Sequence, residues 1–376
     1  MTIPHDSVRS LRLGQWFKLI CGASYQDIPR VRNLALVYSL AGVDCIDVAA
    51  DLAIVRAARR GIAASRGLLK RAAPLLMVSF NDGQDPHFRK AWFDVRQCPS
   101  DCLRPCEQVC PAEAILPLAQ LREGRLGVLP ERCYGCGRCL PVCPHGALEE
   151  HAFQVSVDAV LPDLVPHVDA VEIHTRVGRQ AEFQALWRRL AGYIPHFQVV
   201  AVSCPESDVC DVSVADYLRD LYRAMEPKPK CLIWQTDGRP MSGDIGRGTT
   251  HATIRLAQKV LKAGLPGYVQ LAGGTNHYTV SKLRSLGLLK HLHGADAVPT
   301  VAERIHGIAY GSYARSLVDV GDEPLETCPE KLWQQVGVAC DLVGQIKPGA
   351  RHRPEIVQSL HHYGYSSQVA AAPLPP

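Results

Sequence analysis

What this 376-residue sequence lacks excludes several classes of protein. No apolar run reaches the roughly 20 residues that a membrane-spanning helix needs, and the first residues lack the apolar core of a secretion signal. The formal net charge is only +4, which is too small to indicate a nucleic-acid or membrane-surface partner. We therefore expect a cytoplasmic protein with no transmembrane segment and no nucleic-acid partner.

Cysteine, in contrast, is abundant. Fifteen cysteines without a secretion signal indicate a reducing compartment and metal ligation rather than disulfide bonds. Eight of them form two runs that end alike: residues 98–111 read C-x3-C-x3-C-x3-C-P, and residues 133–144 read C-x2-C-x2-C-x3-C-P. The second run has the spacing of bacterial ferredoxins that bind a [4Fe–4S] cluster, and the first is a loosened copy. A structural zinc site usually takes two separated pairs of ligands, which is a different pattern.

The duplication predicts two [4Fe–4S] clusters. In two-cluster ferredoxins the fourth cysteine of each run binds the other cluster, because one tight loop supplies only three thiolates to a cubane. Cluster I is therefore predicted to be held by Cys98, Cys102, Cys106 and Cys143. Cluster II is predicted to be held by Cys110, Cys133, Cys136 and Cys139.

Apolar runs and helical patterns alternate along the rest of the chain. Strands are expected at Trp16–Gly22, Asp44–Val48, Pro74–Phe80, Ala170–His174, Gln198–Ser203, Cys231–Gln235, Tyr268–Ala272 and Ile305–Tyr310. Helices are expected at Ile28–Leu40, after Asp51, and at Gln180–Ala191, Val214–Met225, Thr250–Ala263 and Thr279–Leu289. Eight such units predict an α/β fold, a (β/α)8 barrel, with an open doubly wound α/β sheet as the alternative.

The cysteine runs interrupt this alternation after the third strand. We expect the first βα units in residues 1–90, a two-cluster ferredoxin-like module in 91–152, the remaining βα units in 153–364 and a disordered tail in 365–376. Loops that follow strands lie at the C-terminal face of a barrel, where active sites are built. The clusters are therefore predicted to lie over the barrel mouth.

Two loops at that face contain candidate phosphate-binding residues. Barrel phosphate sites commonly use the loops after the seventh and eighth strands, with glycine amides and a helix N-terminus. These loops contain Gly273, Gly274, Gly311, Ser312 and Arg315, which are predicted to hold a phosphate such as that of a flavin. The alternative is that these glycines only form turns. A third loop, residues 237–249, is interpreted as a solvated surface loop because its spacing matches no phosphate motif.

The segment Arg12–Ser24, the two cysteine runs and the long C-terminal region together resemble the cyanobacterial light-dependent period family. The resemblance extends over essentially the whole chain. It implies an iron–sulfur protein that passes light-dependent redox state to the circadian clock. It also implies circadian clock proteins and a clock-associated histidine kinase as partners, and the eight cysteines named above as cluster ligands.

Two classes of function remain open on the sequence. One is a redox sensor without turnover, which equilibrates with a quinone or ferredoxin pool. The other is an oxidoreductase that passes electrons from the clusters to a flavin or substrate in the barrel mouth. We favour the sensor, because the resemblance implies it and because no acid–base set in the sequence is specific enough to name.

Overall fold

A computed structural model provides the coordinates of the chain. It describes residues 7–21, 27–69, 72–83, 89–110, 113–117, 127–129, 132–133, 137–152, 157–206, 213–238, 246, 248–289, 304–350 and 354–363. The predicted tail, residues 365–376, lies outside these ranges.

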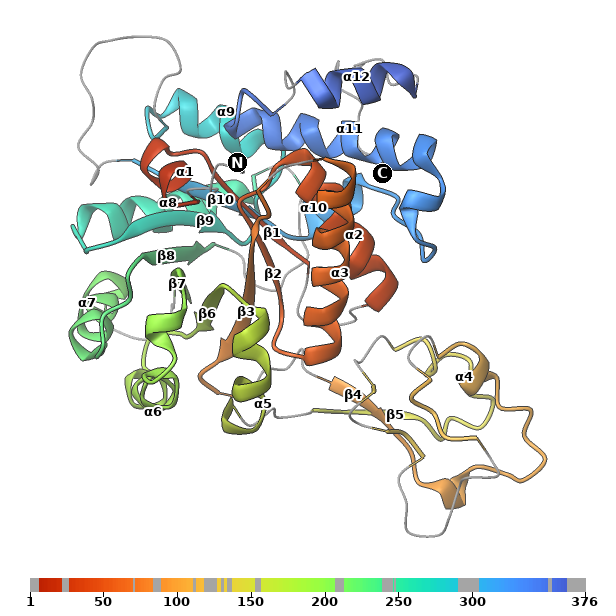
Figure 1. Ribbon diagram of the computed structural model, residues 1–376. Helices are drawn as coiled ribbons and strands as arrows, with labels where there is room; N and C mark the ends of the chain where they lie inside the picture. The colour runs from red at the N-terminus through yellow and green to blue at the C-terminus, as the bar shows by residue number, and fades with distance from the viewer. Residues whose placement is uncertain are drawn as a thin grey trace.

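Eight parallel strands form a closed barrel (Figure 1). Their order around the barrel is β1-β10-β9-β8-β7-β6-β3-β2. Their bounds are β1 (Trp16–Ile20), β2 (Cys45–Ala49), β3 (Leu75–Asn81), β6 (Ala170–His174), β7 (Val199–Pro205), β8 (Leu232–Asp237), β9 (Tyr268–Ala272) and β10 (Gly307–Tyr310). The predicted (β/α)8 barrel is confirmed. The open-sheet alternative is wrong, because β1 pairs with both β2 and β10.

Helices surround the barrel. They are α2 (Ile28–Ala41), α3 (Leu52–Leu68), α5 (Val157–Leu164), α6 (Gln180–Leu190), α7 (Val214–Ala224), α8 (Thr250–Lys262), α9 (Tyr278–Ser285), α10 (Ser312–Leu317), α11 (Pro329–Ile346) and α12 (Pro354–His362). Short 3-10 helices are η3 (Val165–His167), η4 (Ile194–His196) and η6 (Leu325–Thr327). No helix in the described ranges is both long enough and apolar enough to cross a membrane.

Local chemistry sets several helix ends. The Asp51 carboxylate accepts N–H bonds from Ala53 (2.8 Å) and Ile54 (3.3 Å), so it caps α3 as expected. The helix expected at Thr279–Leu289 is longer than the helix in the structure, α9. Gly287 adopts φ +68°, and the Leu288 N–H bonds back to the Leu283 carbonyl, so α9 ends at Ser285.

The barrel interior has an apolar lower half, at the N-terminal ends of the strands. Inward-facing positions of a strand are two residues apart, so Trp16 and Lys18 of β1 lie one above the other. The lower half is filled by Leu11, Trp16, Cys45, Leu75, Met77, Ala170, Val199, Ala201, Cys231 and Ile233. Leu11 belongs to α1 (Ser7–Leu13), so this helix covers the lower end of the barrel.

A separate module is inserted between β3 and β6 (Figure 1). It begins with β4 (Arg89–Trp92) and ends with β5 (Glu149–Ala152), which pair antiparallel with Arg89 opposite Ala152. Between them lie the 3-10 helix η1 (Val95–Gln97) and the short helix α4 (Pro105–Gln108). The module has its own small core, built around Phe93 and Leu148 together with cysteines of both runs.

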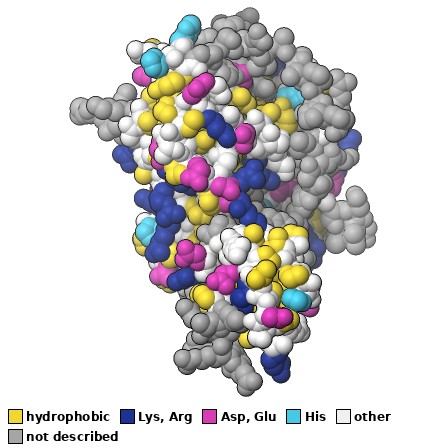
Figure 2. Space-filling view, turned by 90° about the vertical axis from the view of Figure 1, so that its right-hand side faces the viewer, with side chains coloured by type: hydrophobic (Ala, Val, Ile, Leu, Met, Phe, Trp, Pro, Cys, Tyr) yellow, Lys and Arg dark blue, Asp and Glu magenta, His cyan; other side chains and the backbone are white. Residues whose placement is uncertain are grey.

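Figure 2 shows one face of the molecule, with the module at its lower end. Acidic and basic side chains are interleaved over this face, with no large patch of one sign. On the module, Leu103 is 90% exposed between two cysteines of the first run.

Candidate functional site

The structure describes seven of the eight predicted cluster ligands; Cys136 lies outside the described residues. Cys106, Cys133 and Cys139 are buried in the core of the module, and Cys98, Cys110 and Cys143 pack against it. All seven are free thiols. The two runs therefore share one small core, although more than twenty residues separate them in the sequence.

Cys143 of the second run lies beside the cysteines of the first run. Cys102 and Cys143 both act electrostatically on Cys98, and Cys143 and Cys98 both act on Cys106. Burial raises the pKa of the Cys98 and Cys106 thiols, and nearby Arg104 opposes it. This juxtaposition is the one that the crossed ligand assignment of cluster I requires.

Backbone amides surround several of these sulfurs. Burial disfavours the Cys143 thiolate, but hydrogen bonds from the amides of residues 145–148 outweigh burial and lower the pKa of Cys143. The Ala114 amide donates to Cys110 Sγ (3.3 Å), and the Ala91 amide donates to Cys133 Sγ (3.4 Å). Because thiolates are the metal-binding form of cysteine, clustered sulfurs with amide donors fit an iron–sulfur group.

Arg104 lies between Cys102 and Cys106 of the loosened first run, and its side chain reaches back to Cys98. It is the N-cap residue of α4, is only 5% exposed, and adopts φ +52°, which is unusual for a residue other than glycine. Its amide donates to Cys102 Sγ (3.4 Å), and its Nη1 donates to Cys98 Sγ (3.3 Å). Its Nη2 and Nε bond to the Leu116 carbonyl (2.5 Å) and the Glu107 carboxylate (3.1 Å). A fixed guanidinium is therefore directed at a predicted cluster ligand.

Two cations of the module, one in the second cysteine run and one in β4, form ion pairs with the barrel. Arg138, which directly precedes Cys139, bonds to the Asp27 carboxylate and lies 3.3 Å from Asp322. Lys90, which precedes the Ala91 amide donor of Cys133, lies 3.9 Å from the Asp51 carboxylate. Asp27 and Asp51 follow β1 and β2 and stand at the N-terminal ends of α2 and α3, so the module contacts the C-terminal face of the barrel.

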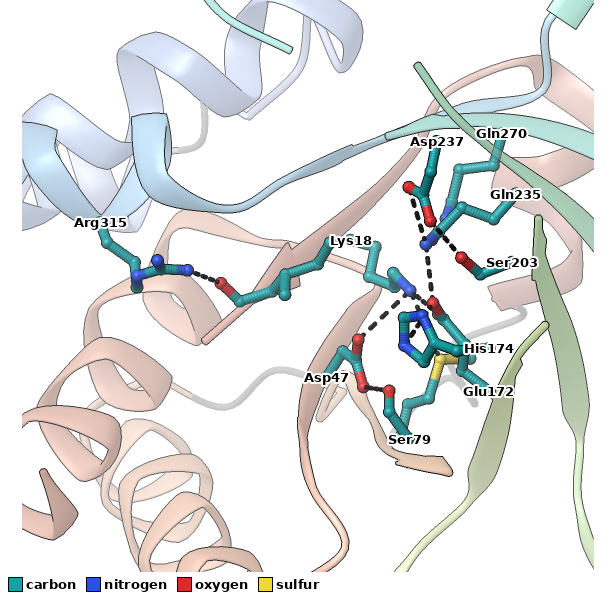
Figure 3. Close-up of polar contacts among 12 residues, drawn as sticks. Lys18, Asp47, Ser79, Glu172, His174, Ser203, Gln235, Asp237, Gln270 and Arg315 are labelled. Atoms are coloured by element: carbon teal, nitrogen blue, oxygen red, sulfur yellow. Dashed lines mark hydrogen bonds and ion pairs between the residues drawn. The ribbon is translucent and has the colours of Figure 1, made fainter. Parts of the chain in front are cut away.

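A polar network fills the upper half of the barrel interior, toward the C-terminal ends of the strands (Figure 3). Its members come from seven strands: Lys18, Asp47, Ser79, Glu172, His174, Ser203, Gln235, Asp237 and Gln270. Lys18 bonds to Glu172 and lies 3.4 Å from Asp47. Ser79 donates to Asp47 (2.6 Å), and Ser203 donates to Asp237. A barrel interior is ordinarily filled by bulky branched side chains, so this network is a distinct feature.

The charged groups of this network strongly affect one another's protonation. Burial disfavours the Lys18 ammonium, but the adjacent carboxylates of Glu172 and Asp47 outweigh burial and raise the pKa of Lys18, which keeps it protonated. Burial raises the pKa of Asp47, and Lys18 opposes that shift. His174 stands at the edge of the network: its Nε2 lies 3.3 Å from Glu172 Oε1, and its side chain is 38% exposed.

The sequence contained a signal for this network that the sequence analysis did not use. One polar residue stands inside each of several short apolar strands, as in WFKLI, CIDVA, AVEIH and YVQLA. Asp237 was interpreted as part of a solvated surface loop. That interpretation is wrong, because Asp237 ends β8 and is only 7% exposed inside the barrel.

The residues of the predicted anion site lie at the ends of the neighbouring strands β9 and β10. Gly274 (φ +96°) approaches the backbone of Thr249 so closely that an added Cβ would lie 2.9 Å from its carbonyl oxygen. Arg315 donates to the Ile20 carbonyl (2.9 Å) and to Ser312 Oγ (3.2 Å). These contacts within the protein use donors of Arg315, and phosphate binding by this group stays a prediction.

Comparisons with known proteins support an iron–sulfur function. A family model described as the Light dependent period A C-terminal domain matches residues 164–345, and one described as the LdpA Fe-S cluster-binding domain matches residues 98–154. Light dependent period A of Synechococcus elongatus is 51% identical over 348 residues, which cover 90% of this chain and 93% of that protein. Electron transport protein HydN of Escherichia coli is 43% identical over 54 residues, 14% of this chain and 27% of that protein. The predicted iron–sulfur binding is confirmed; the number of clusters and the flavin stay predictions.

Proposed function

Because this chain belongs to the Light dependent period A family, we propose that it is a redox sensor that passes light-dependent redox state to the circadian clock. Two [4Fe–4S] clusters are its redox groups, held by the eight cysteines in the crossed arrangement. A quinone or ferredoxin pool sets their oxidation state. Circadian clock proteins and a clock-associated histidine kinase receive the signal, as the family resemblance implies.

The observation that carries this proposal is the pair of module cations, Arg138 and Lys90, that form ion pairs with the barrel. One-electron reduction adds a unit of negative charge to the bound cluster. At about 8 Å and an effective dielectric of about 20, such a charge changes the energy of a cation by roughly 2 kcal/mol. Arg138 is 35% exposed, so solvent screening reduces this to about 1 kcal/mol for its guanidinium. A change of this size shifts a two-state equilibrium by about five- to tenfold.

Asp27 gives that shift a structural target. It is the N-cap residue of α2, yet its side chain makes no capping bond and bonds to Arg138 instead. Reduction attracts Arg138 toward the cluster and weakens its bond with Asp27. The released carboxylate then favours the N-terminal end of α2, where negative charge is stabilising. The cluster's oxidation state is thereby coupled to the surface that α2 presents at the barrel mouth.

Hydrogen exchange of oxidised and reduced protein tests this coupling. We expect the first turn of α2 to exchange differently in the two states, and Arg138→Gln to abolish the difference. Arg96→Gln is the matched control, because Arg96 is an exposed arginine of the same module whose ion pair within the described part of the chain is with nearby Asp94. In parallel, the affinity of circadian clock proteins is measured for the oxidised and for the reduced protein. Equal affinity for both states would reject the proposal that the protein is a redox sensor.

One observation favours a second function, an oxidoreductase that passes electrons from the clusters to a flavin or substrate. The polar network of the barrel lies at the same end of the barrel as the module, which is where barrel enzymes bind their substrates. Extraction of anaerobically purified protein distinguishes the two functions. A stoichiometric flavin that is lost on Arg315→Leu supports the oxidoreductase with the predicted phosphate site.

A further inference from the structure

The upper half of the barrel interior contains a hydrogen-bond acceptor that no described residue of the protein uses. A chain of hydrogen bonds runs from Gln270 through Gln235 to Glu172. It ends at the Glu172 carboxylate, which accepts hydrogen bonds and cannot donate them. Gln235 must therefore direct its amide nitrogen at Glu172 Oε1 (2.7 Å). Its own oxygen then accepts from Gln270 Nε2 (2.6 Å), which fixes the orientation of Gln270 as well. The remaining atom, Gln270 Oε1, is buried and has no hydrogen-bond partner among the described residues.

This orientation is not an arbitrary choice between amide rotamers. Turning Gln270 alone would place two carbonyl oxygens against each other, and turning both amides would place an oxygen against the Glu172 carboxylate. Gln270 is fully buried, and a buried polar atom without a partner costs about 1–3 kcal/mol. An acceptor that no described residue satisfies, inside a hydrogen-bonded network, therefore marks a position where a bound molecule can supply the donor.

The charges of the network specify the kind of donor. Among the described residues, three buried carboxylates, Asp47, Glu172 and Asp237, face the interior, and the Lys18 ammonium is buried among them. Lys18 is already shared between Asp47 and Glu172. Within the described part of the chain, Asp237 receives the Ser203 hydroxyl and a long contact from Gln235 (3.4 Å), so it retains capacity to accept. An anionic ligand would be repelled here, whereas an amine or amidine would complement both Asp237 and Gln270.

We propose that the upper barrel interior is a binding site for a small organic molecule bearing an amine or amidine group, with Asp237 and Gln270 as its acceptors. His174, whose side chain is 38% exposed, is a member of the network that solvent reaches. Lys18 is a positioning residue that holds Glu172, and Glu172 in turn orients Gln235. The site is independent of the sensor function and would serve either as an effector site or as a substrate site.

Matched small probes test the proposal on the holoprotein. Calorimetric titrations with benzylamine and benzamidine are compared with titrations using benzoate and inorganic phosphate. We expect saturable binding of the cationic probes and no competition by the anionic ones. Asp237→Asn and Gln270→Met are each expected to weaken binding of the cationic probes at least tenfold. Asp319→Asn, which alters an exposed carboxylate far from the network, is expected to leave that binding unchanged.

Thermal unfolding of each variant shows whether it remains folded, and Ser203→Ala provides a milder change at Asp237 if the Asn variant does not fold. Ser203→Ala removes a donor that competes for Asp237, so it is expected to preserve or strengthen amine binding. Absence of saturable amine binding would overturn the proposal. So would equal binding of benzoate, or amine binding that is unaffected by both acceptor variants.

Discussion

Arg104 should set the reduction potential of cluster I apart from that of cluster II. Its guanidinium lies 3.3 Å from Cys98 Sγ, and it is buried, so solvent screens it weakly. A positive charge and an N–H···S hydrogen bond both favour the reduced, more negative cluster. Arg104→Gln is therefore expected to lower the potential of cluster I and to leave cluster II nearly unchanged.

The size of the shift follows from simple electrostatics. Two unit charges 4 Å apart interact by about 4 kcal/mol at an effective dielectric of about 20. The electron spreads over the whole cubane, and Glu107 at 3.1 Å neutralises part of the guanidinium, so we expect less than half of that. A tenfold change in the ratio of oxidised to reduced cluster corresponds to about 59 mV for a one-electron couple, and we expect a shift of about that size.

A redox titration followed by electron paramagnetic resonance measures both potentials in one sample. Arg132→Gln is the matched control, because Arg132 lies on the same module and its hydrogen bond among the described residues is to the Glu113 carbonyl at 3.4 Å. Arg104→Gly separates backbone strain from charge, since glycine adopts φ +52° without strain. The reasoning is refuted if an intact cluster I keeps its potential in Arg104→Gln, or if both clusters shift equally.

Three further outcomes follow from the structure. Cys143→Ala is expected to remove the paramagnetic signal of the cluster held by the first run, and Cys110→Ala that of the second; loss of the cluster of the variant's own run contradicts the crossed arrangement. Lys18→Met leaves Glu172 buried without its cation, so urea denaturation should show a free energy of unfolding lower by about 3–5 kcal/mol. Adding Glu172→Gln should restore part of that free energy, and no recovery in the double variant would contradict the pairing. Burial raises the pKa of the Cys21 thiol to about 12 and of Cys231 to about 11, so at pH 8 iodoacetamide should modify exposed Cys328 and spare both, as peptide mass spectrometry can show; equal labelling would refute their burial.

The sequence alone predicted the barrel because each strand is a short apolar run closed by turn residues. All eight strands exist, and no strand end differs from the expected one by more than two residues. The cluster-binding module was predicted from cysteine spacing, which is a local signal. The interior network was missed, because contacts such as Lys18 with Glu172 join residues 154 positions apart and need the barrel register to become visible.

The contacts between the module and the barrel could not be predicted from the sequence either, because they join residues far apart along the chain. Nothing in the run around Cys139 indicates that Arg138 reaches Asp27, 111 residues away. Arg104 illustrates a different limit. The x3 spacing showed that the first run was unusual, but only the structure shows that Arg104 adopts a left-handed conformation and directs its guanidinium at Cys98. The helix expected at Thr279–Leu289 is shorter in the structure, because the left-handed conformation of Gly287 was not predicted.

The antiparallel pairing of β4 with β5 has a consequence for how the protein is made. The chain leaves the barrel after β3 and re-enters it before β6, and these two strands are neighbours in the barrel. Because Arg89 lies opposite Ala152, the points where the chain enters and leaves the module are about one strand spacing apart. For the barrel, the whole insert is therefore equivalent to a short loop between β3 and β6. We therefore expect the barrel to fold whether or not the module holds iron. On this expectation, a chain made in a cell short of iron would have a folded barrel and a module that can be loaded later.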